Sequence, residues 1–280
     1  MSGRRRRWCV VAVAAVCAVL IGPSAPSGAV VAKPIPLPPG AAQNIAADRV
    51  MTWNICNPCG SGQNLGRAAD IATYAPQVVG LQEACVRDVE EIRAHLRTFY
   101  GLTYHVEYGS VLRNWGRCGG PPWQPGGYGQ AILSAAPMTD PVTVEYPDGG
   151  SEDRGYLAVT ATVAGRPVRV FNTHLAQRQQ ESFREKQVAF FAKAVARHER
   201  TIVLGDFNAV PDAPELAPMW SLAKDADPRC HPAADPNCAT TTDWYSKFDY
   251  IFLRGLDARS HAVHASEYSD HHSFRADLKP

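Results

Sequence analysis

The sequence predicts an α/β protein: a single domain built as a two-sheet β-sandwich with helices on its outer faces. Runs of strand-forming residues outnumber segments with helical spacing by nine to three. In both halves of the chain the helical segments lie between pairs of strand-like runs. Helices with one apolar face that are interleaved with strands in this way fit the outside of a two-sheet core.

Each predicted strand is a short run of alternating or continuous apolar residues. These runs span residues 48–55, 77–82, 103–111, 129–134, 156–163, 167–173, 201–205, 248–253 and 273–278. The predicted helices carry apolar residues three or four positions apart. They span residues 65–72, 86–96 and 183–195, and the last ends in Arg197-His198.

The first 32 residues have the pattern of a secretory signal peptide. Arg4 to Arg7 form a basic start, Trp8 to Ile21 an apolar core, and Val30-Val31-Ala32 a small-residue cleavage site. A membrane anchor is the alternative, but the apolar run is shorter than the roughly 18 residues of a spanning helix. We therefore expect an exported protein with a signal peptide over residues 1–32, a proline-rich linker over 33–47 and one folded domain over 48–280.

The charge balance leaves the partner of the protein open. Without the four arginines of the leader, the 28 basic residues fall to 24 against 27 acidic residues, a net charge of −3. A strongly basic face would have favoured long nucleic acid. About 240 residues remain beyond the leader and linker, which is enough for one domain with a large buried core.

Six cysteines lie beyond the leader, an even number that favours disulfide bonds in an exported protein. Cys56-Asn-Pro-Cys59 also has a zinc-site spacing, but no second pair of this kind accompanies it. Cys230 and Cys238 are expected to close a short loop rich in proline and aspartate. The other four cysteines allow three pairings, between which the sequence does not choose; they are Cys56, Cys59, Cys85 and Cys118.

Polar residues with catalytic potential stand at or just beyond six of the strand-like runs. They are Trp53-Asn54, Gln82-Glu83, Asn172-Thr173-His174, Gly205-Asp206-Phe207-Asn208, Asp249 and Ser269-Asp270-His271-His272. Taken singly, most of these residues could cap a helix or build a turn. Their shared position at strand ends, where the side chains of a sheet emerge into a cleft, favours one functional site.

In order, spacing and residue type, these segments resemble the endonuclease/exonuclease/phosphatase superfamily. Its members include deoxyribonuclease, abasic-site endonuclease, neutral sphingomyelinase and inositol-polyphosphate 5-phosphatase. The resemblance runs from about Arg49 to Leu278, and six segments in one order make it specific. It implies a four-layer α/β/β/α sandwich and a metal-dependent attack of water on a phosphate ester.

The residue types suit that reaction. Hydrolysis needs an activated water, relief of negative charge on the phosphoryl oxygens and stabilisation of the leaving oxygen. A hard divalent cation prefers carboxylate and amide oxygens as ligands. We expect Glu83 and Asn54 to hold Mg²⁺, with Mn²⁺ as a usable substitute, and Asp270 to add a ligand directly or through water.

His271 is the predicted general base, because an imidazole changes charge near neutral pH. Successive side chains of an extended segment point to opposite sides, so Asp270 should not orient His271. The resemblance implies that Asp249 does so instead. Only one of the two adjacent histidines can point into the cleft, and His272 is expected to be a packing or surface residue.

Four further roles come from the resemblance. It implies that Asp206 positions the nucleophile or assists the leaving oxygen, and that Asn208 and His174 donate hydrogen bonds to the phosphate. Asp206 and Asn208 lie two positions apart, on the same side of an extended chain. Arg154 resembles a substrate-binding position, with a surface arginine as the alternative. Whether Asp206 or His271 activates the water stays open.

One position departs from the abasic-site enzymes, which carry an aspartate two residues after the motif asparagine. Here that position is Cys56. A disulfide-bonded cysteine cannot replace an oxygen ligand of a hard cation. The departure speaks against abasic-site repair and indicates one principal metal site.

The sequence defines the substrate less sharply. Residues 114–130 form a predicted surface loop with Trp115, Trp123 and Tyr128, which could stack on nucleobases, enter a lipid headgroup region, or cover the core beside Cys118. No long apolar hairpin for entering a bilayer is visible. An extracellular DNA endonuclease is therefore favoured over a lipid phosphodiesterase or a phosphomonoesterase acting on a small metabolite.

The alternative from a different functional class is a binding module that keeps the fold but has no catalytic activity. The acid and base residues are all present, which speaks against it. We expect a monomer whose partner is its phosphate-ester substrate, with no stable protein partner.

Overall fold

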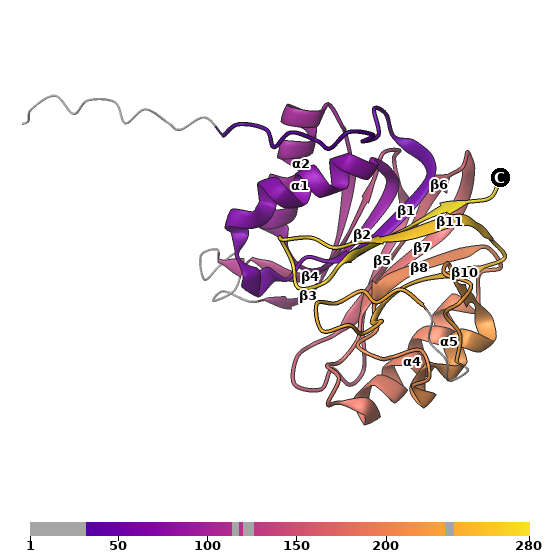
Figure 1. The fold of residues 1–280 in the computed structure, drawn as a ribbon. Coiled ribbons are helices and arrows are strands. Elements are labelled where there is room, and N and C mark those ends of the chain that lie inside the picture. The colour runs from indigo at the N-terminus through magenta and orange to yellow at the C-terminus, as the bar shows by residue number, and fades with distance from the viewer. Residues whose placement is uncertain (1–31, 114–117, 120–125, 233–237) are drawn as a thin grey trace, which may run out of the picture. The chain divides into compact units, whose positions relative to one another are not determined.

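Two six-stranded sheets form the centre of the structure, a computed structural model that describes residues 32–113, 118–119, 126–232 and 238–280 (Figure 1). The strand orders are β11-β12-β1-β2-β4-β3 in the first sheet and β5-β6-β7-β8-β10-β9 in the second. Of the expected leader only Ala32 is described, and Trp115 and Trp123 also lie outside the described residues. The compact unit runs from Pro34 to Pro280.

Each sheet contains six strands, and four α-helices accompany them among the described residues. The first sheet holds β1 (Ala46–Asn54), β2 (Pro76–Cys85), β3 (His105–Arg113), β4 (Gly127–Ser134), β11 (Ala258–His264) and β12 (Ser273–Leu278). The second sheet holds β5 (Thr139–Glu145), β6 (Gly155–Val163), β7 (Arg166–His174), β8 (Thr201–Asp206), β9 (Lys224–Asp225) and β10 (Asp249–Arg254). The α-helices of the described residues are α1 (Asn64–Tyr74), α2 (Val86–Tyr100), α4 (Glu181–Val195) and α5 (Ala217–Leu222).

Three apolar layers explain why the elements stack in this order. Inward-facing residues of both sheets, such as Val78 and Leu204, form the central layer. The outer face of the first sheet packs against α1 and α2, and the outer face of the second packs against α4 and α5. Figure 1 shows the two helix pairs on opposite sides of the sheets. The predicted four-layer sandwich, its nine strands and its three helices are confirmed.

Three strands and one α-helix were not predicted, because the apolar pattern of each is short or weak. Strand β5 is an edge strand that is almost wholly exposed and contains Pro141, and its apolar alternation is limited to Val142 and Val144. Strand β9 has two residues and α5 has six. Strand β11 is the other edge of the first sheet and is only partly covered.

The segment predicted as a linker lies against the domain. Leu37, Ala42 and Ile45 pack on the apolar layer of α1 and α2, and the Tyr100 hydroxyl donates to the Ile35 carbonyl at 3.1 Å. Strand β1 begins within the same segment, at Ala46. In the described part of the chain, no helix is long and apolar enough to cross a membrane.

Two buried amides join the sheets where the central layer meets the strand ends. The Asn172 side chain on β7 donates to the carbonyls of Leu81 and Ala131 in the opposite sheet, both at 2.9 Å. Gln82 Nε2 donates to Asn172 Oδ1 at 2.6 Å. Gly80 allows this approach, because a Cβ there would lie 2.9 Å from Leu204 and 3.0 Å from Asn172. We call Asn172 and Gln82 the inter-sheet amide pair.

The predicted disulfide chemistry is confirmed. The bonds are Cys56–Cys59, Cys85–Cys118 and Cys230–Cys238, which selects one of the three open pairings. Tyr128 is buried against Cys85 and Cys118, so for this residue the structure supports the interpretation as a core cover.

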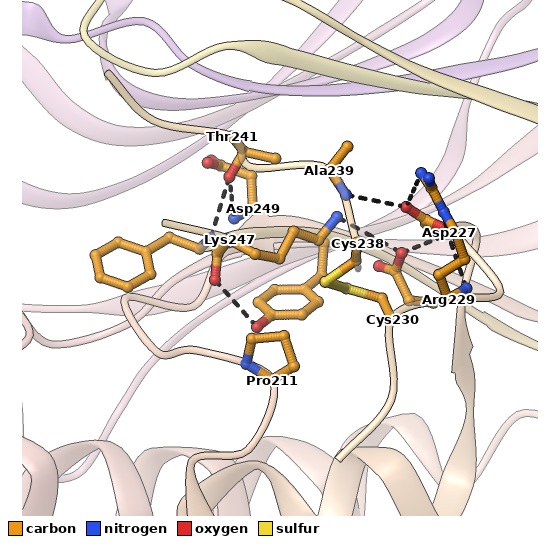
Figure 2. The surroundings of a disulfide bond; sticks show 12 residues. Pro211, Asp227, Arg229, Cys230, Cys238, Ala239, Thr241, Lys247 and Asp249 are labelled. Carbon is orange, nitrogen blue, oxygen red and sulfur yellow. Dashed lines mark hydrogen bonds and ion pairs between the residues drawn. A yellow bond between two sulfur atoms is a disulfide. The ribbon is translucent and has the colours of Figure 1, made fainter. Parts of the chain in front are cut away.

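The Cys230–Cys238 bond closes the loop that leads to Asp249 (Figure 2). Buried Asp227 joins the two residues that flank this disulfide: it accepts hydrogen bonds from the Arg229 side chain at 2.9 and 3.0 Å and from the Ala239 backbone at 3.1 Å. Further along, Thr241 Oγ1 accepts from the backbone N–H of Asp249 at 3.0 Å. Asp227 therefore helps to hold the chain that places Asp249.

This arrangement predicts a pH dependence of stability. Burial alone would raise the pKa of Asp227, but hydrogen bonds from Arg229 and Ala239 lower it to about 2, from 3.8. A carboxyl group whose pKa is lower in the folded state stabilises the fold above its unfolded value, and this contribution is lost as the pH falls through the folded value. We expect Asp227→Asn to lower the melting temperature at neutral pH and to lose less stability than the wild type between about pH 5 and pH 2.

Thermal unfolding measured across that pH range checks the expectation. Asp153→Asn, at an exposed position, serves as the matched control and should follow the wild type. Identical pH profiles for Asp227→Asn and the wild type would contradict the role of Asp227.

Candidate active site

The strand ends with polar residues meet at one cleft. Asn54, His174 and Asp206 end β1, β7 and β8, while Asp249 begins β10 and pairs in register with Asp206. The cleft has a volume of about 330 Å³. The predicted site residues that line it are Glu83, Arg154, His174, Asp206, Asn208, Asp270 and His271. Asn54 and Asp249 are buried behind this wall and bond to residues in it.

His271 and Asp249 form a buried pair at the base of the cleft. Nδ1 of His271 lies 2.8 Å from Asp249 Oδ2, and its Nε2 faces Asp206 Oδ2 at 3.8 Å. The backbone fixes this orientation, because Trp53 Nε1 donates to the His271 carbonyl at 2.9 Å and Ser269 Oγ accepts from the His271 N–H at 3.1 Å. Nε2 is therefore the nitrogen that is directed at the cleft.

Neighbouring charges shift both titrating partners. Burial alone would lower the pKa of His271, but the negative charges of Asp249 and Asp206 outweigh it and raise that pKa. Burial raises the pKa of Asp206 although the positive charge of His271 opposes this. Additional positive charge in the cleft would lower both pKa values, which brings the imidazole toward the neutral form that a general base requires.

Asn54 links the carboxylates. Its Nδ2 donates to Asp206 Oδ2 at 3.0 Å and to Glu83 Oε1 at 3.3 Å, while its Oδ1 accepts from the Cys56 N–H at 3.0 Å. As placed, Asn54 directs its NH₂ group toward the cleft and its oxygen toward the Cys56 backbone.

A turn, and not an extended chain, brings Asn208 beside Asp206. Strand β8 ends at Asp206, and Asn208 has a φ of 51°. The Asn208 N–H donates to Asp206 Oδ1 at 2.8 Å, a local bond that allows this left-handed conformation. The expectation that Asp206 and Asn208 lie on one side of an extended chain is thus wrong, because the chain turns between them. Both side chains nevertheless line the cleft.

Arg154, His174 and Asn208 form a cluster that lines the same cleft as His271. Arg154 Nη1 lies 2.6 Å from His174 Nδ1 and 3.1 Å from its Nε2. Nε2 of His174 also lies 3.3 Å from Asp206 Oδ2 and 3.0 Å from Asn208 Nδ2. Arg154 is 3 % exposed and is held by Glu152 at 2.8 Å, so it is not a free surface arginine.

A hard divalent cation fits the carboxylates of the cleft. A β-bulge in β2 gives Glu83 a φ of 52° and directs its side chain into the cleft. Burial raises the pKa of Glu83, so its ionised form needs a compensating positive charge. Asn54 is the only hydrogen-bond donor to this carboxylate among the described residues. Glu83 and Asp270 thus offer oxygens that suit Mg²⁺.

Two other clusters have the spacing of metal ligands. Asp206, Asp249 and His271 place one ligand atom each within 4.8 Å of one another, and so do Cys56, Cys59 and Asp270. The two cysteines form a disulfide and cannot bind a metal. Within the first cluster the hydrogen bond between Asp249 and His271 already uses one atom of each residue.

The structure adds cleft residues that the sequence did not indicate. They are Gln177, Arg178, Gln179, Trp244 and Phe248. All five lie at loop positions, although Phe248 falls in the strand predicted over residues 248–253. No periodic pattern marks the other four, and the polar run that follows His174 was the one available signal. His272 does not line the cleft, and its Nε2 bonds to Asp243 at 3.0 Å.

A larger hollow of about 530 Å³ lies beside the Cys230–Cys238 disulfide. Its lining includes Trp220, Pro228 and Leu253, and none of the predicted site residues. The chemistry therefore belongs to the smaller cleft.

Comparisons with known proteins agree with this geometry. The sequence matches the family model described as Endonuclease/Exonuclease/phosphatase family over residues 51–271. No curated protein matches the sequence significantly.

Several solved structures share the fold. D. rerio TDP2 complexed with single strand DNA product has a TM-score of 0.66 at 17 % identity, covering 83 % of this chain and 98 % of that chain. Truncated Caenorhabditis elegans TDP2 has a TM-score of 0.64 at 20 % identity, covering 83 % and 97 %. An endonuclease/exonuclease/phosphatase from Beutenbergia cavernae has a TM-score of 0.62 at 23 % identity, covering 82 % and 71 %.

The family match spans most of the chain and includes every site residue from Asn54 to His271. The converging strand ends, the buried imidazole–carboxylate pair and the donor cluster are the parts that hydrolysis of a phosphate ester requires. The chain therefore belongs to the Endonuclease/Exonuclease/phosphatase family and is a phosphoric ester hydrolase.

Proposed function

We propose that the protein is a secreted, Mg²⁺-dependent phosphodiesterase that acts as an endonuclease on extracellular DNA. The observation that carries this proposal is that a carboxylate-oriented imidazole and a cluster of donors line one cleft. A phosphate held between them would meet a base on one side and hydrogen-bond donors on the other.

Each residue has a defined task in the proposed reaction. Asp249 holds Nδ1 of His271, so that Nε2 can accept a proton from the attacking water. Asp206 lies between the two imidazoles, 3.8 Å from His271 Nε2 and 3.3 Å from His174 Nε2, and orients the water or the leaving oxygen. His174 and Asn208 donate to the phosphoryl oxygens, with Arg154 fixing the His174 ring.

Glu83 and Asp270 would hold the divalent cation. When bound, it would neutralise charge on the phosphoryl oxygens and favour the deprotonated form of the attacking water. Asn54 completes this set only if its amide turns its oxygen away from the Cys56 N–H. In the orientation found, Asn54 instead ties Glu83 to Asp206.

Two observations support nucleic acid as the substrate. The D. rerio TDP2 structure of the same fold is a complex with a single strand DNA product. The described part of the chain also shows no wide apolar surface next to the cleft that would enter a lipid layer. Hydrolysis of plasmid DNA, RNA, sphingomyelin and inositol phosphates, compared with Mg²⁺ and with EDTA, tests the choice directly.

Export is supported by the leader pattern and by the three disulfides, since such bonds persist in oxidising compartments. A monomeric enzyme agrees with a catalytic set that one chain supplies in full.

The proposed cation site predicts the behaviour of Glu83→Gln. Removal of the carboxylate charge should lower the rate and raise the Mg²⁺ concentration for half-maximal activity by roughly 10-fold or more. A Mg²⁺ titration of DNA hydrolysis measures both effects. Glu185→Gln, an exposed change on α4, is the matched control and should behave as the wild type. Full wild-type activity in excess EDTA would remove the metal mechanism.

The imidazole–carboxylate pair predicts the behaviour of His271→Asn. Loss of a general base should lower kcat about 100-fold to 10,000-fold, while asparagine can still donate to Asp249 and so preserve folding. Asp249→Asn added to this variant should cost little more, because the two residues act as a unit. Melting temperatures and steady-state rates check both statements.

His272→Ala is the matched control for His271, since it changes the adjacent imidazole that bonds to exposed Asp243. It should keep most of the activity. If His272→Ala abolished turnover while His271→Asn retained it, the assignment of the general base would be wrong by one position.

Export makes a prediction about the mature chain. Protein recovered from the culture medium should begin near Lys33 and carry all six remaining cysteines as disulfides, as mass spectrometry without reduction would show. A variant that starts at Lys33 should stay inside the cell. Retention of the full-length protein with six free thiols would overturn the proposed export.

A further inference from the structure

We propose that Trp244, which lines the cleft, is an aromatic platform on which an unpaired nucleobase next to the scissile phosphate stacks. Arg178, on the loop after β7, would bind a neighbouring phosphate of the same strand. The inference rests on the proposed nuclease function and narrows it to single-stranded nucleic acid. An exposed aromatic ring can stack only on a base that is not already paired within a duplex.

Trp244 and its neighbour Tyr245 are unusually exposed for their size. Trp244 is 45 % exposed and Tyr245 is 84 % exposed. The other large apolar side chains with comparable exposure in the described residues are Val142, Phe190 and Val210, and none of them lines the catalytic cleft. Trp244 does line it, next to His271.

Hydrogen bonds close the backbone of the loop that carries the aromatics. Thr242 Oγ1 accepts from the Ser246 N–H at 2.9 Å, and the Tyr245 N–H donates to the Thr242 carbonyl at 3.0 Å. The Thr241 N–H also donates to the Ser246 carbonyl at 2.8 Å. Tyr245 has a φ of 61°, a conformation that a tyrosine adopts only where surrounding bonds enforce it. The fold thus holds the platform in place before a ligand binds.

The same loop is tied to the catalytic segment. The Asp243 N–H donates to the Asp270 carbonyl at 3.1 Å, and Thr242 forms an isolated β-bridge with His271. The Trp244 and His271 rings lie 5.4 Å apart and nearly perpendicular, at 86°. A base on Trp244 would therefore belong to a nucleotide that contains, or adjoins, the phosphate facing His271.

Arg178 supplies the charge that a strand requires. It is exposed, lines the catalytic cleft and also lines an adjoining hollow of about 220 Å³ beside Asn208 and Phe248. It makes no ion pair with the described residues, whereas Arg154 and Arg184 are bound to Glu152 and Glu215. An unengaged guanidinium next to the scissile position suits a second phosphate of the strand.

A lipid surface is the competing ligand, and the composition of the loop disfavours it. Apart from the two aromatics, the loop from Thr241 to Ser246 consists of threonine, aspartate and serine. The Asp243 side chain is exposed beside Trp244. Helices and loops that enter a headgroup region carry wider apolar faces and basic residues.

The test compares three labelled substrates of equal length: single-stranded oligo-dT, a chain of abasic spacers with the same phosphates, and the oligo-dT paired with oligo-dA. The wild type should prefer the single strand over the duplex. Trp244→Ala should lower kcat/KM on oligo-dT by about 5- to 150-fold, mainly through KM, because one stacked base is worth about 1–3 kcal/mol. Its loss on the abasic chain should be at least about 5-fold smaller, and Trp244→Phe should recover most of the difference.

Arg178→Ala should weaken oligo-dT and the abasic chain equally and should lower the salt dependence of kcat/KM by about one phosphate contact. Phe190→Ala, which removes an exposed aromatic on α4, is the matched control and should leave all three substrates unaffected.

Four results would overturn the inference. Equal losses of Trp244→Ala on oligo-dT and on the abasic chain, with unchanged KM, would show that Trp244 only positions His271. If Trp244→Ala lost binding to sphingomyelin vesicles but cleaved the oligonucleotides as the wild type does, Trp244 would be a lipid contact. Wild-type cleavage of oligo-dT with no effect of Trp244→Ala would refute the platform alone, whereas no cleavage of any nucleic acid would also refute the proposed nuclease function.

Discussion

The inter-sheet amide pair, Asn172 and Gln82, lies directly beneath the cleft, and the geometry of the site depends on it. Asn172 donates to two carbonyls of the opposite sheet and accepts from Gln82, so the ends of β2, β4 and β7 are held in one register. A buried amide that loses its partner costs about 1–3 kcal/mol. Glu83 and His174 each follow one of these amides by one or two positions, so a shift between the sheets would separate the cation ligands from the phosphate donors.

On this frame the sequence concentrates negative charge. Asp206 and Asp249 are buried beside His271, and Glu83 and Asp270 face the same cleft. The positive charges of His271, of Arg154, which is itself paired with Glu152, and of exposed Arg178 do not balance these four carboxylates and an incoming phosphate. Burial also raises the pKa of Glu83 and of Asp206, because it disfavours the charged form of each carboxylate. A divalent cation would offset this negative charge, because it adds two positive charges without another buried side chain.

Much of this could be predicted because it depends on local pattern. Strands that bury one or both faces leave apolar runs, and polar residues at their ends converge wherever the strands share a sheet edge. Edge strand β5 was not predicted, because it buries little and contains Pro141. Trp244 and Arg178 were not predicted as cleft residues, because loop positions follow no periodic pattern. The turn at Asn208 replaced an expected extended chain since the Asp206 carboxylate accepts its N–H.

The Cys56–Cys59 bond connects the disulfide chemistry to the site. Cys56 stands where abasic-site enzymes carry an aspartate, and it adopts a φ of 48°. That turn directs the Cys56 N–H at Asn54 Oδ1, which leaves the Asn54 NH₂ group to bridge Glu83 and Asp206. Cysteine in place of aspartate at position 56 therefore removes one potential ligand oxygen. The Cys56 N–H also occupies a second potential ligand, Asn54 Oδ1. With fewer oxygens at this wall, a cation bound as proposed would depend on Glu83, on Asp270 and on the substrate phosphate for its ligands, so its occupancy would be coupled to the presence of substrate.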